Sequence, residues 1–134
     1  MSTILNNINN LVQEFQDKKI QLVNQLKVEF PNLFTHIFEK YPNLEAFQWN
    51  QYTPYFADGD ECIFSVNECY YIKCTEDEEL VQVYEKDGYR DIAEDINKIL
   101  FKIDDDSMRT MFGDHVEIEL YKDGKIKIDE YDHD

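Results

Sequence analysis

Apolar residues recur at three- and four-residue steps between positions 3 and 29, which predicts one long amphipathic helix. The stripe consists of Ile4, Ile8, Leu11, Phe15, Leu22 and Leu26, and it is interrupted at Lys18 and Gln25. At ~1.5 Å per residue this helix is about 40 Å long, which is longer than a small domain needs. We expect it to pack across the protein's own sheet, and a coiled-coil homodimer through helix 3–29 is the alternative.

The pattern changes after Pro31 and again after Pro42. Residues 32–40 have helical spacing, and residues 46–51 have the composition of a first strand. Residues 62–66 and 69–74 predict a hairpin that turns at Asn67 and Glu68, apolar on both faces and therefore covered on both sides. Residues 80–84 predict a short strand, residues 90–103 a helix, and residues 107–112 one or two further helical turns that end at Gly113.

The last element is a hairpin whose register follows from its pattern. A two-residue loop would place apolar side chains opposite charged ones. A turn that uses Gly124 as a bulge residue sorts the two faces instead, so we predict this second register. The facing pairs are then Leu120 with Ile126, Ile118 with Ile128, and Glu119 with Lys127.

These elements predict an α+β fold. We expect an antiparallel sheet of about five or six strands, with the long N-terminal helix and two or three shorter helices packed on one face. A chain of 134 residues is expected to form a single domain over residues 1–134. Residues 1–41 would be its helical N-terminal part, and residues 44–134 its sheet-forming part with an inserted helix at 90–103.

The charge of the chain is strongly asymmetric. The net charge is −16, of which the first 50 residues contribute only −1 and the remaining residues −15. Such a surface repels nucleic acid and anionic membranes and attracts basic protein surfaces or cations. An acidic surface that only keeps the protein in solution is the alternative. The candidate partner-binding residues are Glu76, Asp77, Glu78, Glu79, Asp104, Asp105, Asp106, Glu117 and Glu119.

Motifs for nucleophilic catalysis are weak in this chain. Ser65 has no G-x-S-x-G context, and the four glycines are too dispersed for a phosphate-binding loop. The three cysteines, Cys62, Cys69 and Cys74, include no C-x-x-C pair, so we expect buried free thiols. We therefore lean toward a protein that is not an enzyme and has no cofactor other than a divalent cation.

Acidic turns and histidines supply the oxygen and nitrogen ligands that a divalent cation needs. The candidate metal ligands are Asp58, Asp60, Asp114, His115 and His133. The alternative is structural, because Asp-Gly and Gly-Asp pairs mark turns and charged tails are solvated.

Three motifs resemble small uncharacterised proteins of bacteria and their phages. They are W-x-Q-Y-T-P-x-F-x-D-G-D-x-C-x-F from Trp49 to Phe64, F-G-D-H-V-E-I from Phe112 to Ile118, and the closing E-Y-D-H-D from Glu130 to Asp134. The resemblance implies no established activity and transfers no catalytic residue. It adds interest in the five metal candidates as one constellation, and it does not extend to the N-terminal helix.

We rank an acidic protein-binding module first, of the inhibitor or immunity type, whose carboxylates imitate the charge of nucleic acid. A metal-binding or metal-dependent enzyme is the alternative. The N-terminus lacks the basic and apolar regions of a signal peptide, and no apolar run is long enough for a membrane span. We therefore expect a cytoplasmic protein of a bacterium or of a phage-infected cell.

Overall fold

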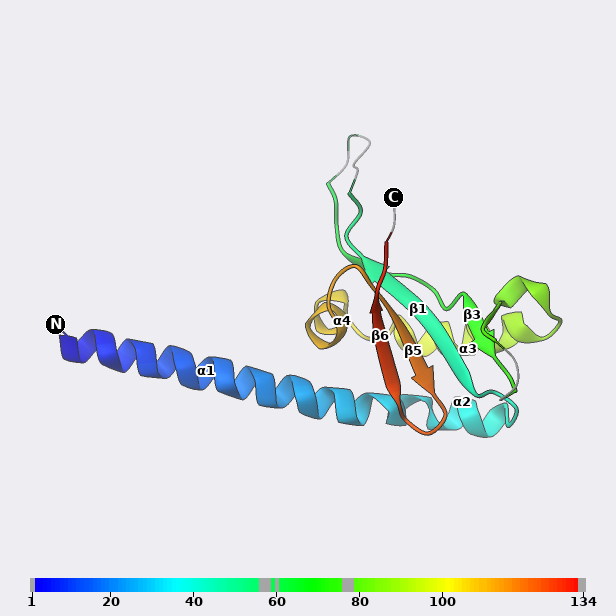
Figure 1. The fold of residues 1–134 in the computed structure, drawn as a ribbon, viewed down its shortest axis with the longest axis horizontal. Coiled ribbons are helices and arrows are strands. Elements are labelled where there is room, and N and C mark those ends of the chain that lie inside the picture. Colours follow the sequence, from blue (N-terminus) through cyan, green and yellow to red (C-terminus); the bar gives the residue numbers. More distant parts are fainter. Residues whose placement is uncertain (1, 56–58, 60, 76–78, 133–134) are drawn as a thin grey trace.

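The computed structural model describes residues 2–55, 59, 61–75 and 79–132. It confirms the predicted fold class: an antiparallel sheet with helices packed against it and a long N-terminal helix (Figure 1). The sheet has six strands, and β1 (Ala46–Tyr52) lies at its centre.

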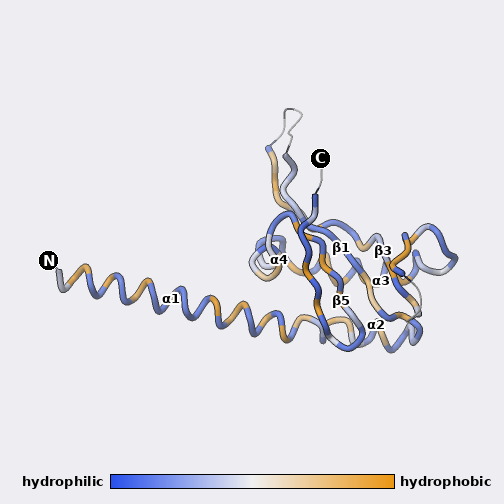
Figure 2. The backbone as a smooth tube through the Cα atoms, viewed as in Figure 1, coloured by the Kyte–Doolittle hydropathy of each residue, from blue (hydrophilic) through white to orange (hydrophobic). Residues whose placement is uncertain are grey.

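The helix α1 spans Ser2–Glu29; its N-terminal part extends away from the rest of the molecule, and its C-terminal part passes beside α4 (Figure 1). None of its residues is buried, and hydrophobic and hydrophilic positions alternate along it (Figure 2). The prediction that this helix packs across the protein's own sheet is therefore wrong. Periodicity identifies an apolar stripe but does not identify what covers it. Among the helices of the described chain, α1 included, none has both the length and the apolar character of a membrane span.

Phe30 anchors α1 to the body, since it follows the helix directly and only 3% of it is exposed. It begins the 3₁₀ helix η1 (Phe30–Phe34), which leads into α2 (Thr35–Lys40). α2 is tied to α3 (Tyr89–Leu100) by Asp95, which accepts hydrogen bonds from Lys40 Nζ at 2.8 Å and from the Tyr41 hydroxyl at 2.6 Å.

The predicted turns after α3 form α4 (Asp105–Phe112). Its N-cap is Asp104, whose carboxylate accepts a hydrogen bond from the backbone N–H of Ser107. Gly113 ends the helix with φ +99°, a conformation that favours glycine. Both α3 and α4 bury their apolar sides, so they cover one face of the sheet.

The strand order is β4, β3, β1, β5 and β6, and β2 pairs with the far end of β1. The remaining strands are β2 (Ser65–Val66), β3 (Tyr71–Lys73), β4 (Val81–Gln82), β5 (Val116–Tyr121) and β6 (Ile126–Glu130). The predicted strand at 80–84 is shorter than expected, because its second half forms the 3₁₀ helix η2 (Val83–Glu85).

The predicted hairpin between residues 62–66 and 69–74 is wrong. β2 and β3 both pair antiparallel with β1, β2 near Tyr52 and β3 near Ala46, so they follow each other along one edge of β1. β1 is long enough to hold both short strands in turn. In β3, Ile72 is buried and Tyr71 is half-buried, so only one face of the strand lies against the core. The prediction that this region is covered on both faces is therefore also wrong.

The hairpin of β5 and β6 has the predicted register. Leu120 faces Ile126, Ile118 faces Ile128, and Glu119 faces Lys127. Gly124 has φ +92° and donates its backbone N–H to Tyr121 O, as a turn with a glycine bulge requires.

An aromatic cluster fills the space between the helices and the sheet. Trp49 from β1 meets Phe30 from η1, Phe112 from α4 and Phe47 of its own strand, and Phe30 also meets Phe112, with ring centroids 5.0–5.9 Å apart. Trp49 is 1% exposed, so it belongs to the core. The opposite face of β1 carries Gln48, Asn50 and Tyr52, and no helix of the described chain covers it.

Candidate functional site

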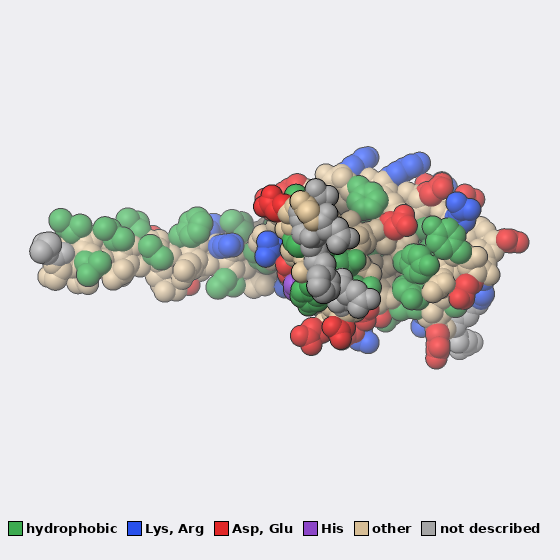
Figure 3. Space-filling model, turned by 90° about the horizontal axis from the view of Figure 1, so that it is seen from above, with side chains coloured by type: hydrophobic (Ala, Val, Ile, Leu, Met, Phe, Trp, Pro, Cys, Tyr) green, Lys and Arg blue, Asp and Glu red, His purple; other side chains and the backbone are tan. Residues whose placement is uncertain are grey.

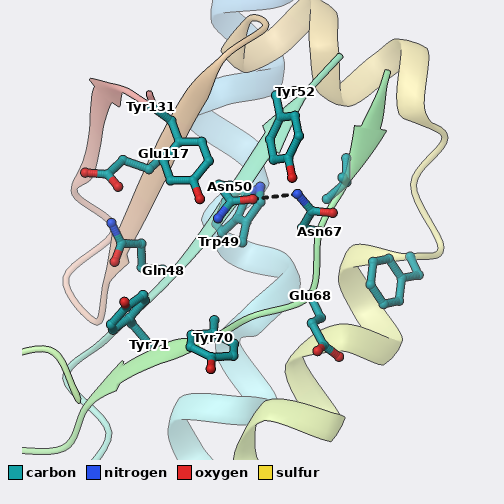
Figure 4. Close-up of a pocket in the computed structure, with 12 residues that line it drawn as sticks. Gln48, Trp49, Asn50, Tyr52, Asn67, Glu68, Tyr70, Tyr71, Glu117 and Tyr131 are labelled. Atoms are coloured by element: carbon teal, nitrogen blue, oxygen red, sulfur yellow. Dashed lines mark hydrogen bonds between the residues drawn. The ribbon is translucent and has the colours of Figure 1, made fainter. Parts of the chain in front are cut away.

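A groove of about 850 Å³ lies on this open face of the sheet (Figure 4). Tyr52 and Tyr131 lie at one end, Tyr70 and Tyr71 at the other, and Asn50 lies between them. The wall on one side comes from the segment between β2 and β3, and the wall on the other side comes from β5 and the residues after β6.

The groove exists because the pairing with β1 shifts between β2 and β3. Gln51 pairs with Val66 and Ala46 pairs with Lys73. The segment from Val66 to Lys73 is therefore two residues longer than the part of β1 that it faces, and the extra residues form a bulge. Asn67 stabilises this bulge by donating its backbone N–H to Asn50 O at 2.9 Å and its side chain to Asn50 Oδ1 at 2.6 Å.

The helices support the same bulge from the covered face of the sheet. Asn97 of α3 accepts the backbone N–H of Cys69 through Oδ1 at 2.7 Å. A buried backbone donor without a strand partner is thereby satisfied. The bulge is consequently held from both faces of the sheet.

Aromatic rings make up much of the lining of the groove. The rings of Tyr52 and Tyr131 lie 5.6 Å apart, and those of Tyr70 and Tyr71 lie 5.4 Å apart. All four tyrosines are half-buried. Phe101, at the end of α3, also lines the groove and is 56% exposed.

Carboxylates give the groove and the adjoining sheet surface an excess of negative charge. Glu117 lines the groove, and its pKa is raised by burial first and then by the neighbouring charges of Asp129 and Glu119. Lys127 offsets part of this charge and lies 3.6 Å from Asp129. Glu68 adds an exposed carboxylate on the other side of the groove.

Tyr121 extends the polar surface along β5. Its hydroxyl donates a hydrogen bond to Glu119 Oε2 at 2.7 Å. That bond, together with burial, raises the pKa of Tyr121 to about 12, so the phenol stays protonated.

Tyrosine faces attract cations, carboxylates form charge-assisted hydrogen bonds with them, and side-chain amides orient a polar ligand. A lysine or arginine side chain satisfies all three groups at once. The chemistry of the groove therefore suits a lysine or arginine side chain.

The structure brings the first two sequence motifs together at the end of β1, and Tyr131 of the third motif donates its backbone N–H to His115 O at 2.8 Å. The buried Gln51 donates through Nε2 to Gly113 O at 2.8 Å and to Met108 O at 2.9 Å. Its Oε1 accepts the indole N–H of Trp49 at 3.2 Å. Gln51 thus fixes the C-terminal turn of α4 to the central strand.

Asp114 and His115 continue this contact between the motifs. Asp114 accepts the backbone N–H of Thr53 at 2.8 Å and its hydroxyl at 2.7 Å. His115 stacks on Tyr55 with ring centroids 4.9 Å apart. His115 has φ +56°, which is uncommon for a residue other than glycine, and Asp114 supports it by accepting its backbone N–H at 2.8 Å.

Asp114 therefore acts as a structural carboxylate in this turn. Burial alone would raise its pKa, but the hydrogen bonds from Thr53 and the proximity of His115 outweigh burial and lower the pKa. Arg109 Nη2 lies 3.5 Å from the same carboxylate and places a positive charge beside it.

The other metal candidates, Asp58, Asp60 and His133, lie outside the described residues. Among the residues that the structure does describe, no three His, Cys, Asp or Glu side chains come together as metal ligands would. A metal site that uses Asp58, Asp60 and His133 with Asp114 and His115 stays a prediction.

The candidate acidic residues divide between the two sides of the sheet. Glu117 and Glu119 lie on the open face, whereas Asp104, Asp105 and Asp106 lie at the start of α4 on the helix side. Glu79 is exposed before β4, and Glu76, Asp77 and Glu78 lie outside the described residues. Acidic side chains are spread over the body in Figure 3, so the open face is distinguished by its tyrosines as well as by its charge.

The cysteines are free thiols, as predicted. Cys69 and Cys74 are buried, whereas Cys62 is only half-buried. Burial raises the pKa of Cys69 to about 12, so this thiol is not a nucleophile at neutral pH.

The sequence analysis did not identify Tyr70, Tyr71, Tyr131 and Asn67 as site residues. A signal was present in β1, where the polar side chains of Gln48, Asn50 and Tyr52 lie at every second position and mark one face of the strand; Asn50 and Tyr52 are half-buried on that face, and Gln48 is buried. Which tyrosines lie beside that face depends on the pairing of β2 and β3 with β1, which the predicted hairpin excluded.

Comparisons with known proteins give no match: no family model fits the chain, and searches of curated proteins and of solved structures find no similar protein. The resemblance to small proteins of bacteria and phages stays a prediction.

Proposed function

We propose that the protein is a non-enzymatic binding module that holds a basic segment of a partner protein in the groove on the open face of its sheet. The observation that carries this proposal is the combination of four tyrosines with Glu117 and Glu68 around one groove. Tyrosine is among the residues that contribute most to binding energy at protein interfaces.

The state of Glu117 supports a cationic ligand. Its pKa is raised because burial and two neighbouring carboxylates disfavour its charge. A lysine or arginine that enters the groove relieves this repulsion and forms a charge-assisted hydrogen bond. The net charge of −16 would accelerate the approach of a basic partner, most strongly at low ionic strength.

In this function the carboxylates take the role that the phosphates of a nucleic acid have in binding a basic surface. The biological role that fits best is an inhibitor or immunity-type protein that blocks the basic surface of a bacterial or phage effector. Binding to nucleic acid itself is disfavoured by the charge of the chain.

Titration with a lysine- and arginine-containing peptide, followed by calorimetry and by backbone amide NMR, tests the proposal. We expect binding that weakens as salt is added, with the largest shifts at Asn50, Asn67 and Glu117. A glutamate-containing peptide of equal length is the ligand control and should not bind.

The matched protein variants are Glu117→Gln and Glu130→Gln. Both remove one negative charge from the β5–β6 hairpin, but Glu130 lies on the opposite side of the sheet because it faces Val116. We expect Glu117→Gln to weaken binding about fivefold to tenfold, as for loss of one charged hydrogen bond, and Glu130→Gln to change it less than about twofold. Equal effects of the two variants, or affinity that is insensitive to salt, would contradict a binding site in the groove.

A further inference from the structure

Seven residues of α1 have the spacing of a coiled-coil seam. Leu5, Ile8, Val12, Phe15, Lys19, Leu22 and Leu26 follow one another at alternating steps of three and four residues. These are the a and d positions of the heptad repeat, and six of the seven are apolar. The seam includes Lys19 rather than Lys18, so it differs from the stripe through Ile4 and Leu11.

This seam is solvent-exposed in the single chain. Its six apolar side chains are 46–70% exposed, and α1 has no buried residue. Figure 3 shows hydrophobic side chains along the whole projecting helix. α1 also contains Asn6, Asn7, Asn9 and Asn10, which are weak helix formers, so burial of the seam would supply the stability that local propensity does not.

The charge of α1 distinguishes it from the rest of the protein. Residues 2–29 carry three lysines and three acidic residues, so their net charge is zero, and the remaining residues carry the entire −16. The strongly acidic body disfavours an anionic membrane as the occupant of the seam. A second copy of a neutral helix meets no such repulsion, and the same seam on both copies is complementary to itself about a two-fold axis.

From these observations we propose that two copies of the chain pair through α1 as an antiparallel coiled coil. The direction follows from the charge, because a parallel pair would bring two bodies of −16 side by side. An antiparallel pair separates them by about 40 Å of helix, several times the Debye length of ~8 Å. The first turn of α1 contains no acidic residue, so its positive dipole end would approach the acidic body of the second copy.

The seam from Leu5 to Leu26 is about 32 Å long. A strip of that length and 10–12 Å wide on each helix gives roughly 700 Å² in geometric area, below the ~1,000 Å² at which stable interfaces begin, so we expect a reversible dimer that depends on concentration. Lys19 is the single charged residue at a core position, and one such residue is a known means of setting the register and number of helices.

Sedimentation equilibrium of the full chain over a range of concentrations tests the pairing. We expect a dimer for the unmodified protein and at least about a 100-fold weaker association for Phe15→Glu, which places a charge in the seam of each copy. Asn10→Glu adds the same charge to the same helix at an exposed position outside the seam, and it should stay within about threefold of the unmodified protein. Near-ultraviolet circular dichroism of Trp49 reports that the body remains folded in both variants.

The direction of the pair is tested with a spin label at position 3. In a Cys62→Ser background the other two native thiols are buried, so Thr3→Cys supplies the accessible site. An antiparallel pair places the two labels roughly 30–45 Å apart, whereas a parallel pair places them within roughly 15 Å. A monomer at all concentrations, a dimer that Phe15→Glu leaves intact, or the short distance would overturn the proposal.

Discussion

The two faces of β1 differ in what covers them, and this difference separates stability from binding. One face presents Phe47 and Trp49 to the helices, and both side chains are at most 1% exposed. The other face presents Asn50 and Tyr52, which are half-buried and line the groove. Substitutions on the covered face should therefore change the free energy of unfolding, and substitutions on the open face should change binding.

The largest effect is expected for Trp49→Ala. Removal of a fully buried indole from the aromatic cluster should lower the free energy of unfolding by about 3–5 kcal/mol. Urea denaturation followed by far-ultraviolet circular dichroism measures this loss. Tyr52→Ala on the open face of the same strand should cost less than half as much, and equal losses would contradict the distinction between the faces.

The second largest loss of stability is expected for Gln51→Leu, although the substitution replaces a polar side chain with an apolar one. The substitution leaves Met108 O, Gly113 O and the indole N–H of Trp49 without their buried partner. We expect a loss of about 2–3 kcal/mol, the cost of unsatisfied buried polar groups.

Gln48→Leu is the matched control, since it makes the same change on the open face of the same strand. We expect its free energy of unfolding to stay within about 1 kcal/mol of the unmodified protein in the same denaturation experiment. A larger loss for Gln48→Leu than for Gln51→Leu would show that the open face, not the contact between the motifs, stabilises β1.

The sequence predicted those parts of the fold that local patterns determine. The register of β5 and β6 was predictable because only one pairing sorts the apolar and charged side chains, and because Gly124 permits the required turn. The end of α4 was predictable from Gly113 for a similar reason.

Features that depend on distant partners were not predictable. The pairing of β2 and β3 with β1 instead of with each other depends on the length of β1 and on the support that Asn97 gives to Cys69. The groove follows from that pairing, so its tyrosines were missed. The amphipathic pattern of α1 predicted a helix correctly, but it contained no information on whether the sheet covers that helix.

Asp114→Asn tests the contact between Thr53, which follows β1, and the turn after α4. The substitution weakens the hydrogen bonds from Thr53 and removes the charge beside Arg109, so we expect a loss of about 1–2 kcal/mol at neutral pH. The pKa of Asp114 is lowered in the folded protein, so its contribution is present above the unfolded value of ~3.9 and is lost as the pH falls through the lower folded value. Thermal melts across acidic pH should therefore show the difference between the two proteins shrinking. A difference that is constant with pH would mean that the carboxylate charge is not involved.

The smallest effect on stability, and the opposite sign, is expected for Glu117→Gln. The pKa of Glu117 is raised by burial and by Asp129 and Glu119, so its ionised form is less favourable in the folded chain than in the unfolded chain. This penalty is present above the folded pKa and disappears as the pH falls below the unfolded value of ~4.3. Glu117→Gln should therefore raise the free energy of unfolding at neutral pH by no more than about 0.5 kcal/mol, because solvent screens the partly exposed site.

That gain should fade at a higher pH than the loss caused by Asp114→Asn, because the pKa of Glu117 is raised and the pKa of Asp114 is lowered in the folded chain. Thermal melts of the two variants and of Glu130→Gln across acidic pH make the comparison direct. A carboxylate that lowers the stability of the folded chain is expected to have another role, such as contact with a ligand. A Glu117→Gln variant that is more stable but binds the peptide more weakly would therefore support a binding role for the open face. A destabilised variant with unchanged binding would instead give Glu117 the same structural role as Asp114.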